Sequence, residues 1–150
     1  KECSMEDVPR RPVAAPPYSL RQSAPHQILV CKACKHLGQS CGPGFALLKK
    51  LRAAVSAAGL SEEFEVTGTA CLAGCDRPCT VAWRATAKAT WFFGDIDPDQ
   101  PIDDLIAFSK LYAAVEDGWM AGSDCPPRLC QNTLARIPAA MIVTAEGVVQ

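Results

Sequence analysis

The sequence predicts one α/β domain whose strands and helices follow in the order β-α-β-β-β-α. Short apolar runs of strand length alternate with amphipathic helical segments, and glycines and prolines separate them. The chain has 150 residues, which is room for one domain of ordinary size. Hydrophobic residues make up 49% of it and charged residues 21%, so a packed core is expected.

The first half of the domain is predicted to be strand, helix and strand. Residues 27–30 form a short apolar run with branched side chains, which is typical of a buried strand. Pro43 stands where a helix begins, and apolar residues then recur at helical spacing until Gly59. Residues 64–67 alternate in polarity, as a half-buried strand does.

The second half is predicted to be a hairpin followed by a helix. Residues 80–84 and 89–93 are the two strand candidates, joined by a short link. Pro101 begins the helix and Gly118 ends it. Its apolar face is expected to consist of Leu105, Phe108, Tyr112 and Val115. This order of elements is the thioredoxin-like topology.

The two ends of the chain are expected to lie outside the domain. Prolines interrupt residues 1–26 and leave no apolar period, which predicts a flexible Pro-rich tail. The domain itself is expected over residues 27–138, with a C-terminal extension at 139–150. Residues 129–137 are expected to form one short helix, and 141–143 either a final strand or a sticky apolar tail.

Charge and motifs exclude several classes of protein. Fifteen basic residues nearly balance sixteen acidic ones, whereas a dedicated nucleic-acid binder needs a basic face. No apolar stretch approaches the roughly 18 residues of a membrane span. The chain lacks the phosphate-binding G-x-x-x-x-G-K motif and the hydrolase motif G-x-S-x-G. These features favour a non-enzymatic protein and indicate no binding to nucleic acid or membrane.

The chain has nine cysteines, an odd number that a complete disulfide framework would not use up. Six of them fall in two clusters beside the predicted core: Cys31, Cys34 and Cys41, then Cys71, Cys75 and Cys79. Such clustering favours metal ligation, and a reducing compartment such as the cytoplasm would keep the ligands as thiols. Cys125 and Cys130 are expected either to pack in the core or to pair under oxidation.

Each cluster can supply a pair of thiolates to one metal centre. The first contains C-x-x-C, and its third cysteine directly precedes the helix, where backbone N–H groups favour thiolate. In the second, Gly74 permits a close approach of the backbone and a sharp turn toward a metal. The two clusters converge if the first two strands are parallel neighbours. Four thiolates suit a 2Fe–2S cluster or a tetrahedral zinc ion.

Other residues near the cysteines leave alternatives open. Four basic side chains could offset the charge of a cluster or be solvated loop charges: Lys32, Lys35, His36 and Arg77. The aromatic residues that alternate on the hairpin strands are expected in the core or in a dimer face: Trp83, Trp91 and Phe93. His26 is expected to be exposed.

Five segments form a combination that is typical of one protein family. They are Leu29-Val30-Cys31-Lys32-Ala33-Cys34, Gly42-Pro43-Gly44, Cys71-Leu72-Ala73-Gly74-Cys75 with Arg77-Pro78-Cys79, Trp91-Phe92-Phe93-Gly94-Asp95 and Ala135-Arg136-Ile137-Pro138. The combination resembles a bacterial family of predicted metal-binding proteins of unknown function. That family is similar to the thioredoxin-like 2Fe–2S ferredoxins, whose second half carries the same C-L-x-x-C element.

The resemblance implies a set of ligands. In the ferredoxins, one cysteine follows the first strand and another shortly precedes the first helix, which match Cys31 and Cys41. The metal-binding family instead features Cys31 with Cys34. The resemblance therefore favours Cys31, Cys34, Cys71 and Cys75 as ligands of the cofactor, with Cys41 and Cys79 as alternates.

Three functions are compatible with these residues. The first is a 2Fe–2S ferredoxin-like electron carrier that works with a redox partner protein. The second is a structural or trafficking protein for zinc or another soft metal. The third is a thiol-disulfide oxidoreductase that uses Cys31 and Cys34, which the long loop before the helix disfavours. A homodimer is compatible with each of them.

Overall fold

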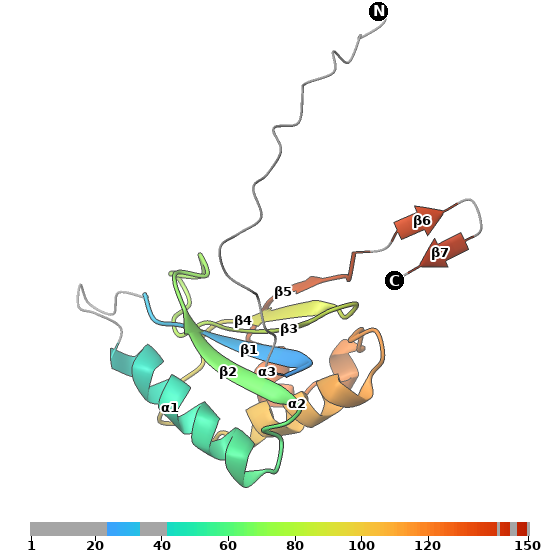
Figure 1. Cartoon of the computed structure of the whole chain (residues 1–150). Coiled ribbons are helices and arrows are strands. Elements are labelled where there is room, and N and C mark those ends of the chain that lie inside the picture. Colours follow the sequence, from blue (N-terminus) through green and yellow to red (C-terminus); the bar gives the residue numbers. More distant parts are fainter. Residues whose placement is uncertain (1–23, 34–41, 141, 145–146, 150) are drawn as a thin grey trace, which may run out of the picture.

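A computed structural model of the protein describes residues 24–33, 42–140, 142–144 and 147–149 (Figure 1). Along the chain the elements are β1 (His26–Cys31), α1 (Gly42–Ala57), β2 (Phe64–Thr69), β3 (Val81–Ala85), β4 (Thr90–Phe93), α2 (Asp103–Ala114), η1 (Gly122–Asp124), α3 (Pro127–Cys130), β5 (Thr133–Ile137), β6 (Ile142–Thr144) and β7 (Gly147–Val149). The predicted order β-α-β-β-β-α is confirmed over β1 to α2. Of the expected N-terminal tail, residues 1–23 lie outside the described part.

The main sheet has five strands in the order β2-β1-β3-β4-β5. β1 and β2 are parallel, with His26 opposite Phe64 and Cys31 opposite Thr69. The other neighbouring strands are antiparallel. A parallel pair needs a crossover connection, and α1 supplies it. The first two strands are therefore parallel neighbours, as convergence of the two cysteine clusters requires.

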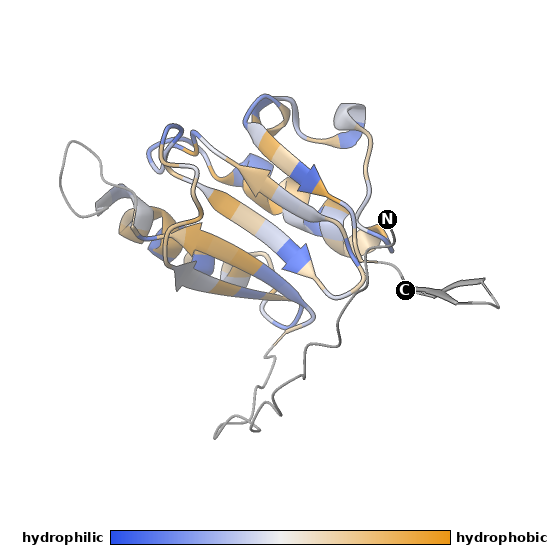
Figure 2. Ribbon diagram, turned by 90° about the horizontal axis from the view of Figure 1, so that it is seen from above, coloured by the Kyte–Doolittle hydropathy of each residue, from blue (hydrophilic) through white to orange (hydrophobic). Residues whose placement is uncertain are grey.

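The two long helices cover one face of the sheet, and we call the opposite face the outer face (Figure 1). α1 turns an apolar stripe toward the sheet, and its fully buried members include Leu47 and Leu51. Apolar residues run along the strands in the view onto the sheet (Figure 2). Among the described residues, no helix is long and apolar enough to cross a membrane.

An aromatic cluster fills the core between α2 and the sheet. The ring of Phe108 lies 5.2 Å from that of Trp83, 5.4 Å from Trp91 and 5.0 Å from Phe93, each in an edge-to-face arrangement. The indole N–H of Trp83 donates to the hydroxyl of Ser109 at 3.0 Å. The hairpin aromatics therefore belong to the core.

The segment from Leu129 to Ile137 differs from the prediction of a single helix. Residues Pro127–Cys130 form α3, and Thr133–Ile137 form β5, which extends the sheet by pairing with β4. The guanidinium of Arg136 stacks on the ring of Trp119 at 3.7 Å. Pairing with β4 and this stacking join β5 to distant parts of the chain, and these contacts outweigh the local helical pattern.

Two further expectations are settled or limited by the structure. His26 is buried rather than exposed, because its ring stacks on Phe64 at 4.9 Å and Nδ1 hydrogen-bonds the carbonyl of Glu63 at 3.0 Å. In the C-terminal extension, Ile142–Thr144 and Gly147–Val149 pair as a separate two-stranded sheet. Met141 lies outside the described residues.

Candidate metal centre

Parallel pairing of β1 and β2 brings the two cysteine loops to the same end of the sheet. Cys31 is the last residue of β1, and it lies opposite Thr69, the last residue of β2. The backbone N–H of Lys32 donates to the carbonyl of Thr69 at 3.0 Å, which extends this pairing by one step. Cys71 then follows two positions after Thr69. The predicted convergence of the loops is therefore confirmed where they leave the strands.

The closest pair of sulfurs lies within the second loop. The Sγ atoms of Cys71 and Cys75 are 3.5 Å apart, and both side chains are exposed. Ala73 has a φ of 62°, and its N–H donates to the sulfur of Cys71 at 3.2 Å. Two thiolates bound tetrahedrally to one metal at about 2.3 Å lie about 3.8 Å apart. The pair therefore fits two ligands of a single metal ion.

The electrostatics of this pair favour a bound cation. The pKa of Cys75 is raised above its ordinary value, first by the hydrogen bond with Cys71 and then by the charge of that thiolate. Burial adds a smaller effect, and the charge of Cys31 acts in the same direction. The charge of Cys71 therefore opposes deprotonation of the Cys75 thiol, whereas a metal ion between the two sulfurs would reverse this effect.

The remaining predicted ligands occupy different surroundings. Cys31 is fully buried at the end of β1. Cys79 is 2% exposed and belongs to the hydrophobic core, and its carbonyl accepts from the N–H of Ile96. Cys34 and Cys41 lie outside the described residues. Within the described part of the chain, no three Cys, His, Asp or Glu side chains gather closely enough to hold a metal ion.

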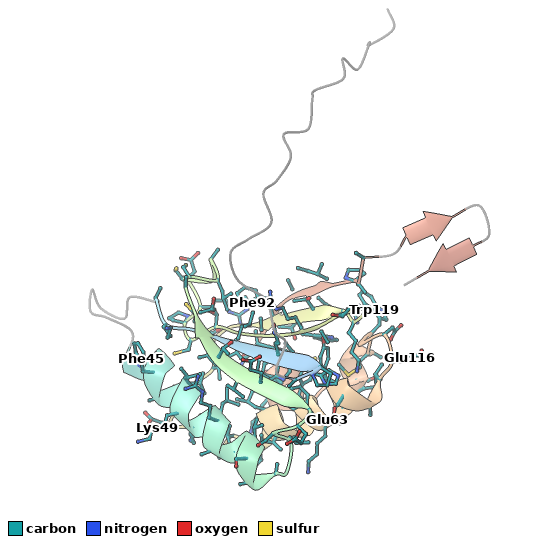
Figure 3. The ribbon with its side chains drawn as sticks, viewed as in Figure 1. Phe45, Lys49, Glu63, Phe92, Glu116 and Trp119 are labelled. Carbon is teal, nitrogen blue, oxygen red and sulfur yellow. The ribbon has the colours of Figure 1, made fainter. Side chains whose placement is uncertain are left out.

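The second cysteine loop lies against the outer face of the sheet. Gly74 packs there so closely that an added Cβ would lie 2.5 Å from a methyl of Thr80 and 3.0 Å from the ring of Phe92. Phe92 projects from the sheet on the side away from the helices (Figure 3). The close approach that the structure shows at Gly74 is therefore to the sheet, whereas the sequence predicted an approach toward a metal.

This contact predicts the effect of a larger side chain at Gly74. We expect Gly74→Ala to lower the free energy of unfolding by about 1–3 kcal/mol, because overpacking forces the loop or the sheet to shift. Gly42→Ala is the matched control, since its Cβ would meet nothing within 4 Å. Urea denaturation of both variants measures the difference, and equal stabilities would contradict the close packing at Gly74.

The exit of the loop is fixed to the segment after β4. The guanidinium of Arg77 pairs with the carboxylate of Asp95 at 2.6 Å, and the N–H of Asp95 donates to the carbonyl of Arg77 at 2.8 Å. A Cβ on Gly94 would lie 2.7 Å from that same carbonyl. Arg77 is thus paired within the fold. Gly94 and Asp95 directly follow the predicted strand 89–93, and their role as an anchor depends on tertiary structure.

Of the other basic residues predicted near the cysteines, Lys32 lies within the described part of the chain. The ammonium of Lys32 lies 5.8 Å from the centroid of the Phe45 ring, at the start of α1. Lys35 and His36 lie outside the described residues.

A buried hydroxyl lies beside Cys31. Thr80 is fully buried, and its Oγ1 has no hydrogen-bond partner among the described residues. Leaving such a group unsatisfied costs about 1–3 kcal/mol. Sequence reasoning missed Thr80, because an isolated threonine next to a cysteine motif carries no signal of its own.

Cys125 and Cys130 form a second thiol pair, away from the two loops. The charge of Cys130 acts on the thiol of Cys125, and the thiol of Cys130 donates to the carbonyl of Gly122 at 3.3 Å. Burial raises the pKa of Cys125 to about 12, and the charge of Cys130 adds to the rise. Cys125 is therefore a core thiol.

This environment predicts slow alkylation of Cys125. With a pKa of about 12, roughly a thousandth of the thiol is ionised at pH 9, so iodoacetamide should modify exposed Cys71 first in the metal-free protein. The raised pKa also stabilises the folded state below pH 9, and that contribution is lost as pH rises toward 12. Peptide mapping by mass spectrometry measures the labelling. Equal rates at the two cysteines would contradict the burial of Cys125.

Comparison with solved structures identifies the class of fold. The chain is similar to two solved structures of a thioredoxin-like 2Fe–2S ferredoxin from Aquifex aeolicus. One match, to the wild-type protein, has a TM-score of 0.50 and 14% identity, and covers 75% of this chain and 98% of that chain. The other has a TM-score of 0.52 and 13% identity, and covers 79% and 99%. The fold is therefore thioredoxin-like α/β, as predicted.

The family follows from the sequence itself. Residues 28–139 match the model of a family described as a protein of unknown function, DUF1636. The match spans most of the chain, so the protein belongs to this family. A search of curated proteins finds no match.

Proposed function

We propose that the protein is a 2Fe–2S ferredoxin-like electron carrier. One observation carries the proposal: β1 and β2 bring Cys31 to the same end of the sheet as Cys71 and Cys75, whose sulfurs lie 3.5 Å apart. The thioredoxin-like fold supports it, because the similar structures are those of a 2Fe–2S ferredoxin. Cys34 would complete the ligand set, with Cys41 and Cys79 as alternates.

The residues of the chain would act as ligands and as a rigid support. A bound cluster would supply one-electron transfer. Cys31 would hold it from the buried side, whereas Cys71 and Cys75 are exposed and would face a redox partner protein. The contact of Gly74 with the sheet fixes the loop that carries these two sulfurs. A reducing compartment such as the cytoplasm would suit these thiol ligands.

In the part of the chain that the structure describes, no helix begins at Cys31, and thiol-disulfide chemistry uses such a helix. In active redox motifs, the N-terminus of a helix lowers the pKa of the first thiol. Here α1 begins at Gly42, well beyond Cys31. Zinc binding remains the second candidate, because a sulfur separation of 3.5 Å fits one tetrahedral zinc ion as well.

Metal analysis of the protein, purified without oxygen from cells supplied with iron and zinc, tests the proposal. We expect about two iron and two sulfide per chain, visible absorption, and an electron paramagnetic resonance signal after reduction. One zinc per chain with no iron would select the zinc protein. A preparation that stays colourless and metal-free after reconstitution with iron and sulfide would overturn the proposal.

A further inference from the structure

The buried hydroxyl of Thr80 lies next to the predicted ligand Cys31. β1 and β3 are antiparallel with Val30 opposite Val81, so the next pair in this register is Cys31 with Thr80. The N–H of Cys31 donates to the carbonyl of Thr80 at 3.1 Å, which shows that the pairing continues. Side chains of directly opposite residues project from the same face of a sheet. The side chains of Cys31 and Thr80 are therefore neighbours on the same face of the sheet.

The second cysteine loop closes over this hydroxyl. A methyl of Thr80 is the atom that a Cβ on Gly74 would meet first, so the loop covers Thr80 directly. Both Thr80 and its neighbour Cys31 are fully buried. Water is excluded from this position, and a hydroxyl there needs a partner within the site.

The chemistry of the site determines which partner suits this hydroxyl. Within the described residues Thr80 Oγ1 has no partner, although its neighbour Cys31 carries a sulfur. A neutral thiol is a weak acceptor, whereas a charged thiolate accepts a strong, charge-assisted hydrogen bond. The anionic sulfur of a centre with its metal bound is therefore a suitable acceptor for this hydroxyl.

We propose that Thr80 donates a hydrogen bond from its hydroxyl to an anionic sulfur of the bound centre, the Cys31 thiolate or a sulfide beside it. This inference rests on the proposed function and adds a positioning residue to it. Hydrogen bonds to sulfur stabilise the more negative, reduced state of a cluster and set its reduction potential. Thr80 would thus make the centre easier to reduce and harder to lose.

Three variants test the hydroxyl separately from the shape of the side chain. Thr80→Val keeps the branched shape and removes the hydroxyl, and Thr80→Ser keeps the hydroxyl. Thr90→Val is the control, because Thr90 opens β4 at the end of the sheet away from Val81. Each protein, reconstituted without oxygen, is assayed for iron and sulfide, and its midpoint potential is measured by redox titration.

We expect the midpoint potential of Thr80→Val to be more negative than that of the wild type. Thr80→Ser and Thr90→Val should keep the wild-type value. If Thr80→Val fails to retain the centre while Thr80→Ser retains it, the hydroxyl is also supported. An unchanged potential and metal content in Thr80→Val would overturn the inference and leave the proposed function standing.

Thermal unfolding of the metal-free proteins, prepared by treatment with a chelator, gives a second measurement that needs no metal. Thr80→Val should unfold at a higher temperature than the wild type, because it removes a buried hydroxyl without a partner. A lower temperature would show that the hydroxyl bonds within the protein, which contradicts the inference.

Two results for the wild type would concern the proposed function itself. If it carries zinc, the inference predicts several-fold faster release of zinc from Thr80→Val than from Thr80→Ser, and equal rates would overturn it. If it takes up no metal, both proposals fail together.

Discussion

Cys75→Ser is expected to lose nearly all bound iron and the visible absorption of the reconstituted protein. Its sulfur lies 3.5 Å from that of Cys71, so the change removes one of two adjacent ligands from the same metal. A neutral serine hydroxyl cannot replace a thiolate at neutral pH, and three thiolates hold a two-iron cluster poorly. Iron and sulfide analysis after desalting measures the loss.

Cys130→Ser is the matched control for this prediction. Cys130 is a partly exposed cysteine outside both loops, and serine can keep its hydrogen bond to Gly122. We expect this variant to retain the metal of the wild type. Full retention by Cys75→Ser would remove Cys75 from the ligand set, with Cys79 the next cysteine to test.

Phe108→Ala should have the largest effect on stability, lowering the free energy of unfolding by about 3–5 kcal/mol. Its ring is fully buried and makes edge-to-face contacts with Trp83, Trp91 and Phe93. Truncation removes those contacts and leaves a cavity between α2 and the sheet. Urea denaturation of the variant and the wild type measures the change.

Phe45→Ala is the matched control, because it makes the same substitution at an exposed phenylalanine. Phe45 is 52% exposed at the start of α1, so Phe45→Ala should change the free energy of unfolding by less than about 1 kcal/mol. If the free energies of unfolding of Phe108→Ala and Phe45→Ala differ by less than about 1 kcal/mol, the aromatic cluster does not stabilise the fold as proposed.

The fold was predictable where local signals and long-range packing agree. Pro43 and Gly59 mark the ends of the region that contains α1, and the apolar run before Cys31 gave a strand. The prediction was wrong for Leu129 to Ile137, where β5 depends on pairing with β4. Such pairing joins residues far apart in the chain, and a local pattern does not contain it.

The candidate site was likewise predictable only where the signal is local in the sequence. Cysteine spacing identified Cys71 and Cys75 as a pair, because two ligands close in sequence can reach one metal through a single turn. The burial of Thr80 depends on how that loop folds onto the sheet. The anchor between Arg77 and Asp95 likewise requires that β4 lie beside the loop.

The aromatic cluster also gives the protein a built-in optical reporter. The protein has three tryptophans. Trp83 is fully buried and Trp91 is 3% exposed, whereas Trp119 is 44% exposed. Buried indoles emit at shorter wavelengths than hydrated ones, so opening the core shifts the fluorescence to the red without any attached dye. Because Trp83 and Trp91 both contact Phe108, the shift of the emission maximum reports on the packing of α2 against the sheet.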